Sequence, residues 1–380
     1  MGKAMGRRAK RIWLALLLFG AGLACGMAAA RYRVAPYVQL DWLHDRYWAS
    51  PAAFGETPPE LFRTDARRLI GIEDVDGVRD LRARTIAFLW GENGLPARPP
   101  DRIETVRLAK YDGLPNLLRV DRLVLAMDHG LVSNAFHLLP ERPNGRAVIY
   151  HHGHVETAGP DDLERMGRLL DEGYAVVELF MPLMGPNSRP LLDLPRIGRF
   201  RLTEHEHLDL LDPAQGDPIG YFIEPAVRVV NHLAPRYRRI AMMGYSGGGW
   251  SAMITAAVDD RVSSSFVIAS VYPYFLSSGS LEDWSHFESG DPDLYARTAT
   301  HLELLTMAAA GPGRQTVQIL NRFDPCCYAG RRSETYAPAV RQAVRRLGGG
   351  EFRAFVDESE RAHTISRRAM DLVLARLRRG

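Results

Sequence analysis

Apolar residues gather into short runs along much of this chain, and the pattern becomes regular near residue 118. From there to the C-terminus, eight runs bounded by turn residues have the length and composition of buried strands. They are 118–127, 131–139, 146–150, 174–181, 239–243, 262–271, 316–320 and 352–356. The first two are separated by Asp128-His129-Gly130, which predicts a hairpin.

Helical patterns lie between several of these runs. The segment Gly159-Pro160-Asp161-Asp162 predicts a helix start, because proline suits the first turn and acids complement the helix dipole. Further helices are predicted from Glu224-Pro225 to Leu233 and over 364–377, each with apolar residues on one face. Strands that alternate with helices predict an α/β fold, a mostly parallel eight-stranded sheet with helices on both faces.

The region 31–115 precedes this pattern and predicts a helical preamble. Apolar residues have helical spacing over 61–72 and 78–90, and 91–101 is a Gly- and Pro-rich loop. These apolar runs are too few for an independent core. We therefore expect a small helical cap or extension that packs on the domain of residues 116–380.

The N-terminus has the features of a targeting segment. Five basic residues lie within 2–11, and 12–30 contains 19 residues without a charge. This pattern predicts a cytoplasmic N-terminus and an extracytoplasmic remainder, held by an uncleaved membrane helix over 1–30 or secreted after signal cleavage. Ala28-Ala29-Ala30 is a possible cleavage site, and Cys25 leaves lipidation as a further alternative.

The composition is that of a globular enzyme. Apolar residues make up 46% of the chain and charged residues 24%, and the net charge of +3 gives no reason to expect nucleic acid as a partner. No repeat and no metal-ligand cysteine spacing is present. Cys326 and Cys327 are adjacent, so they form either a disulfide or two free thiols.

Gly244-Tyr245-Ser246-Gly247-Gly248 is the motif with the clearest chemical content. A serine hydroxyl is a weak nucleophile that needs a base and an exposed position. The pattern G-x-S-x-G between a strand and a helix predicts a sharp turn that exposes the serine, because small neighbours let the turn close.

Residues 118–378 resemble the α/β-hydrolase superfamily at this motif and in the strand–helix order. The resemblance implies that an acid and a histidine follow the serine in the chain. His363 lies after the last predicted strand and before the last helix, which makes it the expected base. Asp324 directly follows the strand 316–320 and is the expected acid, with Asp283 and Asp357 as alternatives.

The same resemblance implies an oxyanion hole made by two backbone N–H groups. One belongs to Gly247, the residue after the nucleophile, and the other to the loop that follows the third strand. That loop reads His151-His152-Gly153-His154, so we expect His154 to be the second donor. The alternative is a metal site built from the three histidines of this loop, with Glu156 as the one carboxylate that follows at ligand spacing.

Two long connections, at about 183–223 and 272–312, are expected to form a lid or substrate wall. The sequence predicts a serine hydrolase that cleaves a small-molecule carboxylic ester through an acyl-enzyme, without cofactor or metal. The alternatives are a peptidase or amidase of the same fold and a non-catalytic binding protein of that fold. The sequence leaves the oligomeric state open.

Overall fold

The chain divides into two compact units, Met1–Ala53 and Phe54–Gly380. The computed structural model describes residues 13, 16–26, 54–276 and 290–379. In the first unit, residues 16–26 are helical and carry exposed apolar side chains. None of the helices among the described residues has both the length and the apolar character of a membrane span, so the predicted membrane helix finds no support. Part of that run, including 27–30, lies outside the described residues.

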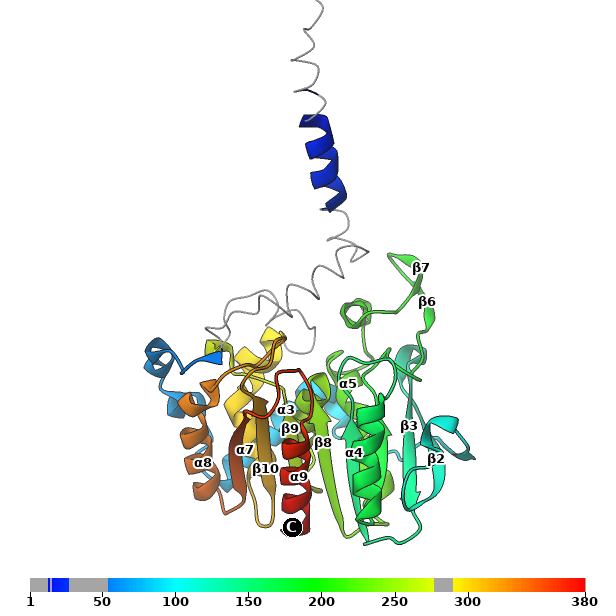
Figure 1. Cartoon of the computed structure of the whole chain (residues 1–380), viewed down its shortest axis with the longest axis vertical. Helices are drawn as coiled ribbons and strands as arrows, with labels where there is room; N and C mark the ends of the chain where they lie inside the picture. Colours follow the sequence, from blue (N-terminus) through cyan, green and yellow to red (C-terminus); the bar gives the residue numbers. More distant parts are fainter. Residues whose placement is uncertain (1–12, 14–15, 27–53, 277–289, 380) are drawn as a thin grey trace, which may run out of the picture. The chain divides into compact units, whose positions relative to one another are not determined.

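The second unit is built on a mixed sheet, which has nine strands among the described residues (Figure 1). Its spatial order is β1-β2-β3-β5-β4-β8-β9-β10-β11. The strands are β1 (Arg102–Val106), β2 (Leu117–Ala126), β3 (Val132–Pro140), β4 (Arg146–His151), β5 (Ala175–Leu179), β8 (Arg239–Tyr245), β9 (Val262–Ile268), β10 (Gln315–Asn321) and β11 (Glu351–Asp357). β1, β2, β3 and β5 pair antiparallel in that order, and β5, β4, β8, β9, β10 and β11 pair parallel in that order. All eight predicted strands are present, and the sheet is mostly parallel as expected.

The ninth strand, β1, corrects the prediction of a purely helical preamble. It lies at the sheet edge against β2, and most of its residues are exposed or half-buried. Its pairing uses polar side chains, because the Thr105 hydroxyl donates to Asp121 at 2.8 Å and Arg122 pairs with Glu104. An edge strand of this kind carries no apolar run, so the pattern of hydrophobic residues did not reveal it.

The rest of the described preamble is helical and packs within the second unit. α3 (Val75–Trp90) is capped by Asp74, whose side chain accepts the amide of Gly77, and it buries Val78, Leu81 and Leu89. The predicted segment 61–72 instead forms two short 3-10 turns, η2 (Pro59–Arg63) and η3 (Ala66–Leu69).

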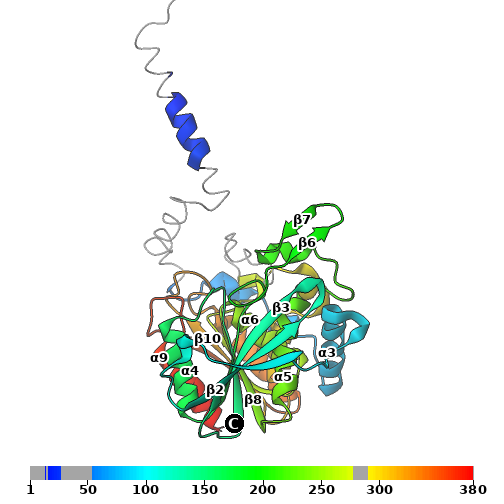
Figure 2. The same cartoon turned by 90° about the vertical axis from the view of Figure 1, so that its right-hand side faces the viewer.

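Helices cover both faces of the sheet, as predicted. α4 (Pro160–Asp171) and α9 (Arg367–Arg379) lie on one face, where their apolar residues share a core with Val148 and Val176. The other face, where Ile149 and Val177 point, carries α3, α5, α6, α7 and α8 (Figures 1 and 2). These elements are α5 (Gly220–Leu233), α6 (Gly247–Val258), α7 (His301–Ala309) and α8 (Ala337–Arg346). Burial on both faces explains why the central strands read as continuous apolar runs.

Two helix starts differ from the predicted ones. α5 begins four residues before Glu224 and contains Pro225 in its interior. Its early start is stabilised by Asp217, whose side chain accepts the amide of Ile219 at 2.9 Å. α9 begins at Arg367 instead of 364, because the preceding residues belong to the loop that carries His363.

The two long connections differ in character. In the first, the antiparallel hairpin of β6 (Leu191–Leu194) and β7 (Gly198–Arg201) projects from the body of the unit, and η7 (His205–Leu210) follows (Figures 1 and 2). In the second, α7 is a buried helix of the main core. Residues 277–289 of the second connection, including Asp283, lie outside the described residues.

The parallel strands end at one edge of the sheet. β4 ends at His151, β8 at Tyr245, β10 at Asn321 and β11 at Asp357. Because ligands of open parallel sheets bind outside the carboxyl ends of the strands, the loops that follow these four strands define the region of interest.

Candidate active site

Ser246 occupies a strained turn between β8 and α6. Its backbone has φ 55° and ψ −127°, a conformation that residues other than glycine rarely adopt. The turn is closed by the Ser246 amide, which donates to the Ile268 carbonyl at 3.0 Å, and by the Ser246 carbonyl, which accepts the amide of Gly249 at 2.8 Å. This geometry matches the sharp strand-to-helix turn that the motif predicts.

The glycines of the motif are required by close backbone contacts. A Cβ on Gly244 would lie 1.8 Å from the carbonyl oxygen of Gly248. A Cβ on Gly248 would lie 2.4 Å from the carbonyl oxygens of both His151 and His152. No side chain fits at such distances, so the turn packs directly on the end of β4 and the loop after it.

The loop after β4 also lies against the serine itself. A Cβ on Gly153 would come within 2.7 Å of the Ser246 Cβ and 3.4 Å of its Oγ. The next residue, His154, therefore belongs to the backbone segment that borders the hydroxyl. Gly247 is the first residue of α6, and the first amides of a helix have no partner within it. The two predicted oxyanion donors thus lie on the two backbone segments that flank Ser246.

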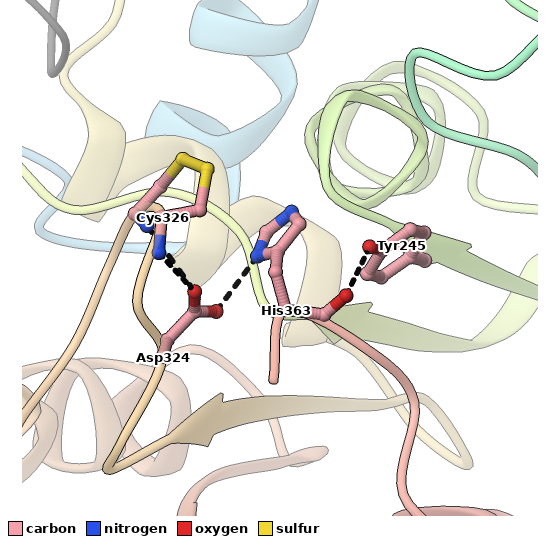
Figure 3. Close-up of a disulfide and its surroundings, with 5 residues drawn as sticks. Tyr245, Asp324, Cys326 and His363 are labelled. Atoms are coloured by element: carbon pink, nitrogen blue, oxygen red, sulfur yellow. Dashed lines mark hydrogen bonds and ion pairs between the residues drawn. A yellow bond between two sulfur atoms is a disulfide. The ribbon is translucent and has the colours of Figure 1, made fainter. Parts of the chain in front are cut away.

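His363 and Asp324 are brought together by the loops after β11 and β10 (Figure 3). His363 Nδ1 and Asp324 Oδ2 are 2.7 Å apart. The histidine loop is held on both sides, because the Asn321 side-chain amide donates to the carbonyls of Ala362 at 3.2 Å and Thr364 at 2.7 Å. The base and the acid of the predicted set therefore form a hydrogen-bonded pair.

Tyr245 places this pair next to the serine turn. Its hydroxyl donates to the His363 carbonyl at 2.5 Å, and its ring centroid lies 4.9 Å from that of His363. Burial raises the pKa of Tyr245, so the phenol stays protonated and keeps donating. Since Tyr245 directly precedes Ser246, the loop that carries His363 contacts the residue next to the predicted nucleophile.

Asp324 is a buried carboxylate whose two oxygens are both used. Its side chain has no exposed surface. While Oδ2 faces His363, Oδ1 accepts the backbone amides of Cys326 at 2.9 Å and Cys327 at 3.2 Å. Buried polar groups are costly unless they are hydrogen-bonded, and both oxygens of this carboxyl group have partners. Cys326 and Cys327 are joined by a disulfide, one of the two alternatives for the pair.

Asp357, an alternative acid, has other partners. Its Oδ1 accepts the amide of Ser359 at 2.9 Å and the hydroxyl of the same residue at 2.7 Å, and its Oδ2 accepts the hydroxyl of Ser366. These bonds connect the end of β11 to the start of α9. Asp357 therefore connects the two ends of the loop that carries His363. Among the described contacts it makes no hydrogen bond to the His363 imidazole. Asp283 lies outside the described residues.

The histidines around Gly153 point to separate partners. Burial lowers the pKa of His151 to about 4, and its neutral ring donates from Nδ1 to the His152 carbonyl. His152 lies 3.0 Å from Glu178, and His154 Nε2 lies 3.2 Å from His205 Nδ1. Among the described residues, Glu156 pairs with Arg189, so the alternative metal set does not converge on one point.

Glu178 is a buried carboxylate that sequence reasoning missed. It contacts Lys110 at 2.7 Å, His152 and the hydroxyl of Tyr111. Although burial opposes ionisation, the hydrogen bond to His152 and the charge of Lys110 hold the pKa of Glu178 below its ordinary value. It lies inside a strand, β5, where an isolated charged residue gives no sequence signal of function. Its contact with His152 holds the ring of the residue that precedes Gly153.

Comparisons with known proteins identify the fold. No protein-family model and no curated protein matches the sequence. Among solved structures, acetyl xylan esterase 1 from Thermoanaerobacterium sp. JW/SL YS485 is similar, with TM-score 0.53, 15% identity and coverage of 84% of this chain and 98% of that one. The methylesterase BT1017 gives TM-score 0.54 at 17% identity, covering 84% of this chain and 68% of its own.

A third solved structure has a similar fold. The glucuronoyl esterase from Solibacter usitatus has TM-score 0.53 and 12% identity, with coverage of 80% of this chain and 93% of that one. At such low identities the likeness concerns the fold, and that fold is the one the serine motif and the strand order predicted. This chain has the α/β-hydrolase fold.

Proposed function

We propose that this protein is a serine hydrolase that cleaves a carboxylic ester, with Ser246 as nucleophile, His363 as base and Asp324 as acid. The observation that carries the proposal is the hydrogen-bonded pair of His363 and Asp324 beside the strained turn of Ser246. A buried carboxylate on Nδ1 leaves Nε2 of the imidazole to accept a proton. This is the arrangement that activates a serine hydroxyl.

The reaction proceeds in two halves. His363 takes the proton of the Ser246 hydroxyl while the oxygen attacks the ester carbonyl, and the imidazolium then protonates the departing alcohol. Water next attacks the acyl-enzyme, with His363 again as base, and the acid is released as Ser246 regains its proton. Asp324 stabilises the imidazolium in both halves.

The backbone supplies the electrostatic part of catalysis. Negative charge develops on the carbonyl oxygen in each half of the reaction, and the amides of Gly247 and His154 are the proposed donors. Each such donor contributes roughly 2.7–4 kcal/mol to the transition state. The contact of Gly153 with Ser246 supports this assignment, because it brings the second segment next to the attacking oxygen.

Three structural neighbours support an ester as substrate. They are an acetyl xylan esterase, a methylesterase and a glucuronoyl esterase. We therefore place this chain with esterases and make amide cleavage an outcome of the test. The same residues could cleave an amide, because the two mechanisms differ only in the leaving group.

The test combines labelling with a substrate panel. The wild-type protein should react with a fluorophosphonate probe and hydrolyse p-nitrophenyl esters, and Ser246→Ala should do neither while keeping its thermal midpoint. Aminoacyl p-nitroanilides measured in parallel decide between ester and amide. Unchanged turnover in Ser246→Ala would remove the serine from the mechanism. A wild-type protein that neither reacts with the probe nor turns over would favour a binding protein.

We also propose that residues 1–30 direct the protein out of the cytoplasm, that 31–115 form an extension and that 116–380 carry the reaction. The support is the basic N-terminal flank followed by the uncharged run of 12–30. A reporter active only outside the cytoplasm, fused after Gly380, should work. N-terminal sequencing of the mature protein distinguishes an intact start from cleavage before Arg31.

A further inference from the structure

The loop that carries the proposed acid also carries a disulfide between neighbouring residues. Cys326 is exposed and Cys327 is half-buried, two and three positions after Asp324. Both sulfur atoms and a ring nitrogen of His363 lie within 4.8 Å of one another. Figure 3 shows the disulfide beside the pair formed by Asp324 and His363. A redox-active pair of atoms thus borders the reacting groups.

The two cysteines hold the acid through their backbone. Asp324 Oδ1 accepts both of their amides, at 2.9 and 3.2 Å, while Oδ2 faces His363 at 2.7 Å. Hydrogen bonds to an ionised carboxylate are about twice as strong as neutral ones. The two amides therefore set the orientation in which the carboxylate meets the imidazole.

The disulfide restrains the peptide that carries these amides. A bond between neighbouring side chains closes a small ring that contains the peptide between Cys326 and Cys327, so the backbone cannot rotate freely there. The base of the loop is held separately, because the amide of Gly330 donates to the Arg322 carbonyl at 2.9 Å. Opening the disulfide would release the tip of the loop and leave its base in place.

We propose that Cys326 and Cys327 form a redox-modification site that positions Asp324, so that reduction by a dithiol lowers turnover. This inference rests on the proposed hydrolase function. The cysteines are positioning residues, because they act through Asp324. Since Cys326 is exposed, a thiol reductant can reach its sulfur.

The exchange is balanced in atoms and electrons. A thiolate of the reductant attacks Cys326 Sγ, the disulfide breaks, and Cys327 leaves as a thiolate that takes a proton. The second thiol of the reductant then attacks the mixed disulfide, which releases Cys326 as a thiol and oxidises the reductant by two electrons.

The test uses the full-length Cys25→Ser protein, which removes the third cysteine. Thiol titration should find no free thiol before treatment with dithiothreitol and two after it. Turnover of a p-nitrophenyl ester should then fall about ten- to hundredfold, as expected for a small misplacement of a catalytic group, with little change in KM. Reoxidation should restore it, and the low-field proton resonance of a His Nδ1–H bound to a carboxylate should weaken and return in parallel.

A double variant provides the matched comparison. Cys326→Ser with Cys327→Ser should have the low turnover of the reduced protein and should not respond to dithiothreitol. The proposal is overturned if turnover stays full when both thiols are free, or if the disulfide cannot be reduced. It is also overturned if circular dichroism shows that the reduced protein has lost its turnover by unfolding. The chemical reduction decides the matter if the double variant does not fold.

The outcomes separate this inference from the proposed function. A protein that is active in both redox states refutes the redox site and leaves the hydrolase assignment intact. A protein that neither reacts with the fluorophosphonate nor turns over in its oxidised state refutes both.

Discussion

Replacing Gly153 by alanine tests the contact between the loop after β4 and the serine turn. The added Cβ would lie 2.7 Å from the Ser246 Cβ and 2.8 Å from the Tyr245 carbonyl oxygen. Ordinary contacts between carbon atoms begin at about 3.5 Å, so the two segments must separate by roughly 1 Å. The neighbouring atoms belong to backbone and to a Cβ, which cannot rotate away.

The expected effect is on catalysis more than on folding. A misplacement of about 1 Å at a reacting centre lowers the rate about a hundredfold, so kcat/KM for a p-nitrophenyl ester should fall by that factor in Gly153→Ala. The rate of fluorophosphonate labelling should fall in parallel, because both reactions need the same approach to Ser246. Thermal unfolding of each variant should be recorded to exclude a general loss of structure.

Gly159→Ala is the matched control. Gly159 lies in the same connection, at the start of α4, and a Cβ there would meet only the Asp162 carboxylate at 3.8 Å, an ordinary contact. This variant should retain full kcat/KM. If Gly153→Ala is folded and equally active, the loop does not lie against the nucleophile as described, and His154 is not the oxyanion donor.

Three further predictions concern buried ionisable groups. Asp324→Asn should lower kcat by up to about 10⁴-fold, whereas Asp357→Asn should lower the thermal midpoint more than kcat; the reverse result would exchange their roles. Glu178→Ala should lower the free energy of unfolding in urea by roughly 1–3 kcal/mol, because the buried His152 ring and Tyr111 hydroxyl lose their acceptor; a loss below about 0.5 kcal/mol would contradict this. Burial lowers the pKa of His301 to about 3, below its ordinary value of about 6.5. Its contribution to stability is present above pH 6.5 and is lost as pH falls toward 3, by about 3 kcal/mol at pH 4.5. Urea unfolding of the wild type and of His301→Gln at pH 7 and 4.5 measures this loss of stability. An equal decrease in the free energy of unfolding in both proteins would show that His301 is not its cause.

The sequence alone determined the elements whose burial is uniform. Strands such as β4 and β5 are covered on both faces, so their apolar runs were visible without any structure. The serine motif could also be recognised from the sequence. The close backbone contacts at Gly244 and Gly248 permit no side chain, so glycine is required at both positions. These signals are local, and one stretch of residues carries each of them.

The tertiary structure decided whatever depends on partners far apart in the chain. The edge strand β1 needs only one neighbour and little burial, so its residues follow no apolar pattern. Three aspartates remained eligible as the acid, and only the folded loops show that Asp324 reaches His363 across 39 positions while Asp357 binds serines. The amides of Cys326 and Cys327 on that carboxylate are backbone contacts that no side-chain pattern encodes. Hydrophobic periodicity reports which face of an element is buried, whereas the meeting of loops at one sheet edge depends on how all the strands are ordered.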